Sequence, residues 1–259
     1  MATETRSVDT QDLERRVQEM YREVADEPQN EFHFEIGRAL AERLGYPPTE
    51  LDAIPSEATE SFAGVGYYFD LAAIRPGETV VDLGSGSGMD TFLAARQVGS
   101  AGRVIGIDMT EAQLEKATRL ACAHGFANAE FRNAHIEQLP LEDASADAVI
   151  SNGVVNLSPA KERVFAEAAR VLRPGGRLAI ADIVTNTQLP VSVTCDASLW
   201  AACIGGAMQR DDYRDAIESA GFELHDIKEN DQYRFVSERA EKATRKYGVK
   251  SVSLLAVKP

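Results

Sequence analysis

Two aspartates and a run of alternating glycines are the residues of this sequence whose types and spacing are best suited to chemistry. Asp82 follows a short apolar stretch and precedes Gly84, Gly86 and Gly88. Glycines let the backbone take positive φ and allow a ligand to approach without meeting a Cβ. A helix is expected directly after them, and its unpaired N–H groups attract polar or anionic ligands. Asp108 ends the next apolar stretch, where a carboxylate can accept hydrogen bonds from ribose hydroxyls. The pattern predicts a site for a nucleotide-containing cofactor.

The spacing of the glycines distinguishes between two kinds of nucleotide site. A dinucleotide fingerprint has glycines at its first, third and sixth positions, whereas the run from Gly84 to Gly88 has them at the first, third and fifth. Asp108 lies about 20 residues beyond Gly88, as expected of one strand–helix–strand unit. Together with Asp82 ahead of the loop, this arrangement resembles the S-adenosylmethionine (SAM) site of class I methyltransferases. A site for another nucleotide cofactor and a purely structural turn are the alternatives.

This resemblance implies a set of residues around SAM. Asp108 would contact the ribose, and the loop at 133–140 would hold the adenine ring. At His135 we expect the backbone N–H to face adenine and the imidazole ring to be solvated, with a catalytic base as the alternative. The residues expected to bind the cofactor are Asp82, Gly84, Ser85, Gly86, Gly88, Asp108, Met109, Gln113, Ala134, His135, Ile136 and Asn152.

Strand and helix patterns alternate through the middle of the chain. Apolar stretches of strand length are separated by segments whose apolar residues recur every three or four positions, which is the spacing of a helix. Such alternation indicates an α/β fold in which helices cover both faces of a parallel sheet. The seven predicted strands cover residues 80–83, 103–108, 129–132, 147–152, 177–184, 233–237 and 251–257.

Local signals predict where several helices begin or end. Thr110 and Gln113 form a capping-box pattern at the start of one helix. Ser158 followed by Pro159 predicts the start of another, with serine as the N-cap and proline in the first turn. Gly45 follows a helical pattern and is expected to end it in the left-handed conformation.

Composition and charge exclude several classes of function. The chain has 259 residues and a formal net charge of −14, which disfavours nucleic-acid and anionic-membrane partners because these require clustered Lys and Arg. No apolar run has the length of a membrane span, and the start lacks the pattern of a signal peptide. The three cysteines fit neither a disulfide framework nor a metal site. A cytoplasmic protein without a bound metal is therefore expected; its oligomeric state is left open.

Further segments resemble one family within the class I methyltransferases. Asn-Leu-Ser-Pro at 156–159, Arg-Pro-Gly-Gly at 173–176 and Cys-Ile-Gly-Gly-Ala at 203–207 are, with the glycine loop, similar to segments of the arsenite SAM methyltransferases. The resemblance implies a Rossmann-like seven-stranded class I SAM-dependent methyltransferase fold with an N-terminal helical cap. The implied divisions are a cap at 1–60 and a SAM-binding domain at 61–259, with an acceptor-side insertion at about 185–210.

The family binds trivalent arsenic through three cysteine thiolates, which are soft ligands for a soft centre. Of the three corresponding positions, only Cys203 carries a thiol here. Val65 and Gly153 occupy the other two. Cys195 is near Cys203 in the sequence but matches none of these positions. One or two thiols cannot form a site of three thiolates, so the sequence favours an acceptor other than arsenite.

The predicted reaction is methyl transfer from SAM to a small-molecule acceptor, which leaves S-adenosylhomocysteine. Because the leaving group departs neutral, positioning of the acceptor can supply much of the rate, and a thiol or another soft nucleophile needs no strong base. The alternatives are arsenite methylation with a reduced cysteine set, O-, N- or C-methylation of a small metabolite, and a SAM-binding sensor without catalysis. The candidate catalytic residues are Asn156, Tyr67 and Cys203, and the candidate acceptor-binding residues are Val65, Tyr68, Gly153, Trp200 and Cys203.

Overall fold

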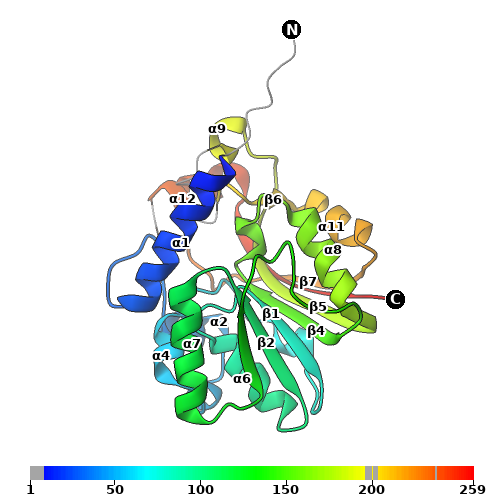
Figure 1. The fold of residues 1–259 in the computed structure, drawn as a ribbon. Coiled ribbons are helices and arrows are strands. Elements are labelled where there is room, and N and C mark those ends of the chain that lie inside the picture. Colours follow the sequence, from blue (N-terminus) through cyan, green and yellow to red (C-terminus); the bar gives the residue numbers. More distant parts are fainter. Residues whose placement is uncertain (1–8, 196–199, 201–203, 237) are drawn as a thin grey trace.

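A mixed β-sheet forms the centre of the protein (Figure 1). The computed structural model describes residues 9–195, Trp200, 204–236 and 238–259. Within these ranges the sheet has eight strands, which follow the order β3-β2-β1-β4-β5-β8-β7 with the short β6 paired to β5. The strands are β1 (Thr79–Leu83), β2 (Arg103–Asp108), β3 (Ala129–Asn133), β4 (Ala146–Asn152), β5 (Leu172–Thr185), β6 (Met208–Gln209), β7 (Glu223–Glu229) and β8 (Lys250–Val257).

Neighbouring residues of the parallel strands point to opposite faces of the sheet. Val80 of β1 belongs to one apolar cluster and Val81 to the other, and Val104 and Ile105 of β2 divide in the same way. This alternation follows from the period of two of an extended chain. All four side chains are buried. The strands are therefore apolar along most of their length, as the predicted parallel sheet requires.

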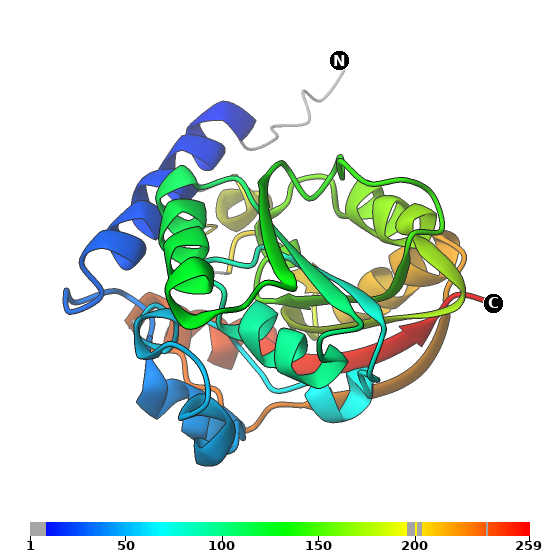
Figure 2. The same cartoon turned by 60° about the horizontal axis from the view of Figure 1, so that its bottom comes forward.

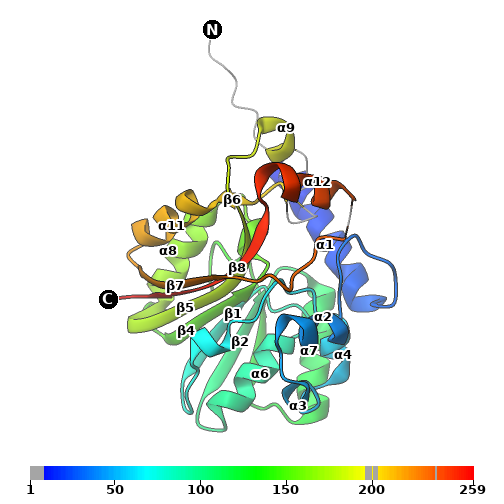
Figure 3. The same cartoon turned by 180° about the vertical axis from the view of Figure 1, so that it is seen from behind.

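Helices cover both faces of the sheet (Figures 1 and 3). On one face, α6 (Met89–Val98) and α7 (Glu111–His124) pack into the apolar cluster that contains Val80. On the other face, α8 (Lys161–Val171) and α11 (Arg210–Ser219) pack into the second cluster. The predicted α/β architecture, a largely parallel sheet with helices on both faces, is thereby confirmed, and the short β6 accompanies seven longer strands.

Helices also precede the sheet. The longest of them is α1 (Thr10–Asp26), and Asp9 is its N-cap residue. The Asp9 carboxylate accepts hydrogen bonds from the backbone N–H groups of residues 11 and 12 at 3.1 Å. It lies beside α7 (Figures 1 and 2). The others are α2 (Arg38–Leu44), α3 (Pro48–Leu51), α4 (Ser56–Glu60) and α5 (Phe69–Ala72). Helix α2 ends at Gly45 with a φ of 109°, as predicted.

The tail of the chain differs from the prediction at one strand. The prediction of a strand at 233–237 is wrong. Residues 233–236 form no strand, residue 237 lies outside the described residues, and β7 is the strand that pairs with β8 at this edge of the sheet. The pairing of β7 with β8 shifts register between Leu224 and Asp226. Such a bulge adds a residue to one strand, so the inward-facing Leu224 and Ile227 are three positions apart rather than two. The bulge hid the strand alternation from the sequence pattern.

Three further helical elements are short, namely the 3-10 turn η1 (Val155–Leu157), α9 (Val191–Thr194) and α12 (Glu238–Tyr247). Two of them, α9 and α12, lie near the same end of the molecule as the start of α1 (Figure 1). Helix α12 occupies most of the polar connection before β8, where no element was predicted. Across the described ranges, no helix combines the length and the hydropathy that crossing a bilayer demands.

Candidate functional site

A cavity of about 410 Å³ lies at the carboxyl ends of β1, β2 and β4. The glycine loop after β1, the turns after β2 and β3, and Asn152 at the end of β4 line it from the sheet side. Helix α1 lines it from the other side with Leu13, Val17 and Tyr21. Ligands of open α/β sheets bind at this edge, so the fold and the sequence motif point to the same place.

The glycine loop brings the backbone into contact with the cavity wall. Gly84 has a φ of 70°, and a Cβ there would lie 2.3 Å from a methyl group of Val154. A side chain at this position would therefore collide with the wall and strain the backbone. Gly86 donates its N–H to Asp108 at 2.9 Å. Gly88 precedes α6 with a φ of 93° and does not line the cavity.

Asp82, the acid ahead of the loop, is buried and lines the cavity. Thr91, in the first turn of α6, donates its hydroxyl to Asp82 Oδ2 at 2.6 Å. Burial and the nearby Asp90 carboxyl raise the pKa of Asp82 above its usual range, because both disfavour the charged form. A cationic group placed in the cavity would favour the charged form of this carboxyl.

Asp108 and Ser85 face the cavity with unused hydrogen-bonding capacity. Asp108 accepts from the N–H of Gly86 and from that of Thr110 at 2.8 Å, and a carboxylate has further lone pairs to offer. The Ser85 hydroxyl is buried and has no hydrogen-bond partner among the described residues. Since buried polar groups are normally paired, both groups fit a ligand that carries hydroxyl or amino groups.

Gln113 joins the glycine loop to helix α1. Its Oε1 accepts from the Ser87 hydroxyl at 2.5 Å, and its Nε2 donates to the carbonyl of Tyr21 at 2.8 Å. The capping box predicted for Thr110 and Gln113 is therefore not formed, although Thr110 is the N-cap residue of α7. The glutamine is used to hold α1 against the cavity instead.

The turns after β2 and β3 form another part of the cavity wall. Met109, Ala134, His135 and Ile136 all line the cavity. The Ala134 N–H donates to the Asp108 carbonyl at 3.1 Å, which keeps the two turns together. The imidazole of His135 is 53% exposed and its Nε2 lies 3.5 Å from a carboxylate oxygen of Glu14 in α1. The ring is thus largely solvated, as expected from the sequence.

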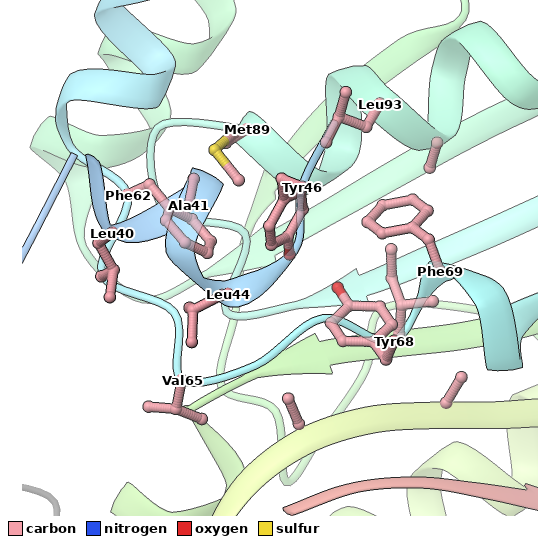
Figure 4. Packing of buried hydrophobic residues seen from close by; sticks show 14 of the residues in the cluster. Leu40, Ala41, Leu44, Tyr46, Phe62, Val65, Tyr68, Phe69, Met89 and Leu93 are labelled. Carbon is pink, nitrogen blue, oxygen red and sulfur yellow. The ribbon is translucent and has the colours of Figure 1, made fainter. Parts of the chain in front are cut away.

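A carboxylate that the sequence patterns did not single out lies on the floor of the cavity. Asp90 accepts hydrogen bonds from the hydroxyls of Tyr46 at 2.8 Å and Tyr68 at 2.7 Å, and from Asn152 Nδ2 at 3.2 Å. Burial raises the pKa of Asp90, while these donors oppose the shift. Figure 4 shows Tyr46 and Tyr68 in the same apolar cluster. With Asp82, this residue makes the cavity floor acidic.

Asn152 ties the segment before β1 to the cavity. Its Oδ1 accepts from the N–H of Val65 at 2.7 Å, and its Nδ2 donates to the carbonyl of Gly66 at 3.0 Å. A Cβ on Gly64 would lie 2.6 Å from the same Nδ2. The glycines at 64 and 66 therefore permit close contact between this segment and β4.

Most of the residues predicted for the acceptor do not line the cavity. Tyr68 is buried beneath it with its hydroxyl on Asp90, and Tyr67 packs edge-on against Tyr46 with ring centroids 5.0 Å apart. Burial raises the pKa of Tyr67 to about 12, so its phenol is a poor base at neutral pH. Val65 is buried in the apolar cluster of Figure 4.

The acceptor candidates of the second half of the chain lie around η1. Asn156 is buried within η1, and Gly153 precedes that turn with a φ of 74°. Trp200 is buried and donates its Nε1 to the Thr194 carbonyl at 2.7 Å. Cys203 lies outside the residues that the structure describes.

The helix start predicted at Ser158 and Pro159 is displaced. Helix α8 begins at Lys161 with Ala160 as its N-cap. The Ser158 hydroxyl accepts from the Ala160 N–H at 3.0 Å and donates to Glu137. Ser158, Pro159 and Glu137 line the cavity, so this segment serves as wall rather than as the first turn of the helix.

Comparison with known proteins gives a consistent set of relatives. A family model described as "Methyltransferase domain" matches residues 74–221. The arsenite methyltransferase of Halobacterium salinarum is 44% identical over 192 residues, which are 74% of this chain and 49% of that protein. The arsenite methyltransferase of Aquipseudomonas alcaligenes is 38% identical over 179 residues, 66% of this chain and 51% of that protein. The chain spans about half the length of these curated relatives.

Solved structures share the fold. An arsenic(III) S-adenosylmethionine methyltransferase from Chlamydomonas reinhardtii is 34% identical, with a TM-score of 0.65, and the match covers 86% of this chain and 74% of that one. A geranyl diphosphate C-methyltransferase from Streptomyces coelicolor has a TM-score of 0.68 at 20% identity, over 94% of this chain and 98% of that one. The second likeness shows the fold alone. The chain belongs to the methyltransferase-domain family, it has the fold of the class I methyltransferases, and arsenite methyltransferases are among its relatives.

Proposed function

We propose that this chain transfers the methyl group of SAM to a small-molecule acceptor. The observation that carries the proposal is the acidic floor of the cavity, where Asp82 and Asp90 are buried next to the glycine loop and Asp108 stands beside it. SAM bears a sulfonium, an ammonium and two ribose hydroxyls. Carboxylates and the unpaired Ser85 hydroxyl complement all of these groups.

The proposed roles of the lining residues follow from their chemistry. Asp108 and Ser85 bind the ribose end, and Asp82 and Asp90 stabilise the cationic end. The turn from Ala134 to Ile136, with Met109, holds the adenine ring. Gln113 and Asn152 act by fixing α1 and the segment at 64–66 around the site, and Gly88 acts through the backbone that starts α6.

SAM, when bound, supplies an electrophilic methyl carbon and a neutral leaving group. The chain's task is therefore to orient the acceptor and to exclude water. We propose a thiol or another soft nucleophile as the acceptor, because Tyr67 is a poor base and such acceptors need none. Asn156 and Tyr67 then act by positioning other groups, since neither lines the cavity. Cys203 remains a candidate for contact with the acceptor.

Arsenite methylation is the second candidate. It is favoured by the 44% identity to an arsenite methyltransferase. Against it stand Val65 and Gly153, which replace two of the three cysteines implied by the family resemblance. A site that retains only Cys203 would have to borrow thiolates from thiol ligands already carried by the arsenic.

We also propose that the helices at 10–60 form a cap over the site, because α1 lines the cavity from outside the sheet. A segment within 185–210 would form the acceptor side. A reducing compartment such as the cytoplasm is proposed because Cys122 is an exposed thiol outside any disulfide.

Two measurements test the proposed function. Calorimetry with SAM and with S-adenosylhomocysteine tests cofactor binding, and the absence of binding by either overturns the proposal. Transfer from methyl-labelled SAM is then measured against a panel of thiols, arsenite, phenols and amines. Transfer to thiols supports the first candidate, transfer to arsenite alone establishes the second, and tight binding without transfer to any of them favours a SAM sensor.

A further inference from the structure

Lys161, the first residue of α8, is a lysine removed from solvent: it is 4% exposed. Its ammonium donates to two main-chain carbonyls, that of Ser158 at 2.7 Å and that of Asn156 at 3.1 Å. Its Nζ also lies 5.0 Å from the centroid of the Trp200 ring, so the aromatic face is a third partner. Lysine is seldom buried unless paired, and this one is paired with carbonyl dipoles and an indole.

Trp200 is packed tightly against the glycines that follow it in the sequence. A Cβ on Gly205 would lie 2.3 Å from Cδ1 of the indole, and a Cβ on Gly206 would lie 2.8 Å from its Cε3. A Cβ on Gly206 would also lie 2.0 Å from the carbonyl oxygen of Asn156. Gly206 therefore touches both the indole and the turn that Lys161 binds. These close approaches explain why residues 205 and 206 are glycines.

The turn bound by Lys161 is part of the wall of the cofactor cavity. Val154, Leu157 and Ser158 line that cavity. The methyl groups of Val154 fill the space next to Gly84 in the glycine loop, where a Cβ would lie 2.3 Å away. The ammonium of Lys161 thus connects the cavity wall on one side with Trp200 and residues 204–207 on the other.

The electrostatic surroundings make this connection sensitive to protonation. Burial lowers the pKa of Lys161 to about 8, although three carboxylates oppose the shift: Asp182 of β5, Glu162 of α8 and Glu137. Asp182 accepts from the Tyr213 hydroxyl at 2.7 Å, and burial raises its pKa to about 6. Around pH 8 Asp182 is therefore ionised, while Lys161 titrates. Burial also raises the pKa of Asp82 on the cavity floor to about 8, so an Asp82→Asn variant is needed to separate the two titrations.

We propose that Lys161 is a positioning residue that fastens Trp200 and residues 204–207 to the wall of the cofactor cavity, and so sets its acceptor side. Loss of the proton removes the cation–π contact and leaves only the weaker hydrogen bonds of a neutral amine, whereas loss of the side chain removes all three contacts. Either change loosens the indole from the turn. The effect on methyl transfer rests on the proposed function. The contact between Lys161 and Trp200 does not depend on the proposed function, because it can be measured through the fluorescence of Trp200.

Trp200 is the sole tryptophan of the chain, so its fluorescence reports this contact directly. Emission and acrylamide quenching are recorded on both sides of pH 8 for wild type, Lys161→Met and Lys161→Arg. Lys246→Met is the matched control, because Lys246 also lies 5.0 Å from an aromatic ring, that of Tyr247, but is exposed. Wild-type emission should change with a midpoint near pH 8, with the indole more accessible to acrylamide above it.

The variants separate the charge from the packing. Lys161→Met should leave the indole, at every pH, at least as accessible to acrylamide as it is in wild type above pH 8. Lys161→Arg should keep the low-pH spectrum because a guanidinium does not titrate in this range, and Lys246→Met should follow wild type. Wild-type emission that does not change with pH overturns the proposal. If Lys161→Met fails to fold, the titration of Asp82→Asn keeps the test decisive, because the change near pH 8 should persist in that variant and its loss would assign the change to Asp82.

The effect on methyl transfer is measured with the acceptor that the labelled-SAM experiment identifies. Lys161→Met should raise the KM for that acceptor about tenfold and change the dissociation constant of SAM by less than about threefold. A loss of SAM affinity equal to the loss in acceptor KM overturns the assignment to the acceptor side. If no acceptor is found, the proposed function fails while the fluorescence titration still tests the fastening.

Discussion

Gly153 lies directly against Val65: a Cβ at residue 153 would come within 3.2 Å of the Val65 Cγ1. These are the two positions at which the resemblance to arsenite methyltransferases implies cysteines. In this fold they are neighbours, although 88 residues of sequence separate a loop before β1 from the end of β4. Val65 is 1% exposed and packs among apolar side chains (Figure 4). An apolar contact thus occupies the place of two potential metalloid ligands.

Gly153→Ala should destabilise the protein by about 1–2 kcal/mol, because its φ of 74° is a left-handed conformation that costs an L-residue that much. Urea unfolding measures the change. Val65→Ala is the matched control, since it removes the facing side chain and leaves the backbone alone. If the cost of Gly153→Ala disappears in the Val65→Ala background, the contact rather than the backbone conformation is responsible.

Asp108→Asn should weaken SAM binding by about 1–3 kcal/mol, because charge-assisted hydrogen bonds to the ribose become neutral ones. Calorimetry measures the affinity. Asp226→Asn, which changes an exposed aspartate of β7, removes the same charge far from the cavity lining and should leave affinity unchanged. Equal affinities for the two variants would show that Asp108 does not contact the cofactor.

SAM binding should release protons near neutral pH. Burial raises the pKa values of Asp82 and Asp90 in the free protein, and the positive charges of SAM lower them again, so affinity should rise with pH. Calorimetry in two buffers of different ionisation enthalpy counts the protons. S-adenosylhomocysteine lacks the sulfonium charge and should release fewer. Proton uptake, or equal release with both ligands, would contradict this account of the acidic floor.

Asp182→Asn should remove part of the pH dependence of stability. Burial raises the pKa of Asp182 from 3.8 to about 6, so this group contributes stability below pH 3.8 that is lost as pH rises through 6. Between these values the free energy of unfolding of wild type should fall relative to the variant, by at most about 1.4 kcal/mol per pH unit. Unfolding in urea at several pH values measures the slope.

Asp147→Asn is the control for that slope. In wild type, hydrogen bonds from the Thr79 N–H and from Arg173 outweigh burial and lower the pKa of the Asp147 carboxyl. The contribution of Asp147 to the free energy of unfolding therefore changes with pH in the opposite direction. It is present above the usual pKa of an aspartate and lost as pH falls. Slopes of the same sign for the two variants would show that burial does not govern Asp182.

Much of the fold could be predicted because its signals are local. The apolar centres of β1, β2 and β4 and the glycine loop between β1 and α6 are each contained in a few consecutive residues. The end of α2 at Gly45 is equally local, because one residue with a left-handed backbone sets it. The displaced start of α8 and the missed β7 show the limit: a wall contact of Ser158 and a bulge at residue 225 depend on partners elsewhere in the chain.

Of the candidate site, the sequence predicted the residues of the glycine loop and the acids at the ends of β1 and β2, and not the contacts that other side chains make with them. Asp90 lies two residues after Gly88, the last glycine of the run, but nothing in the sequence pairs it with Tyr46, 44 residues earlier. Gln113 matched a capping pattern, yet the fold uses its amide between Ser87 and Tyr21 because α1 lies within reach. Hydrogen bonds between distant segments carry no periodic signal. A single sequence therefore indicates the cofactor site and leaves the network beneath it undetermined.

Helix α1 forms a wall of the cavity, yet it lies outside the sheet and is held by the apolar packing of Leu13 and Val17 and by polar contacts with α7. Gln113 donates to the Tyr21 carbonyl and Lys116 to the Ala25 carbonyl, each at 2.8 Å. We expect a molecule in the cavity to be covered on this side for as long as α1 stays docked. The residence time of the cofactor is thus coupled to the docking free energy of a helix that makes none of the sheet's hydrogen bonds. Weakening that docking should speed product exchange while the glycine loop keeps its shape.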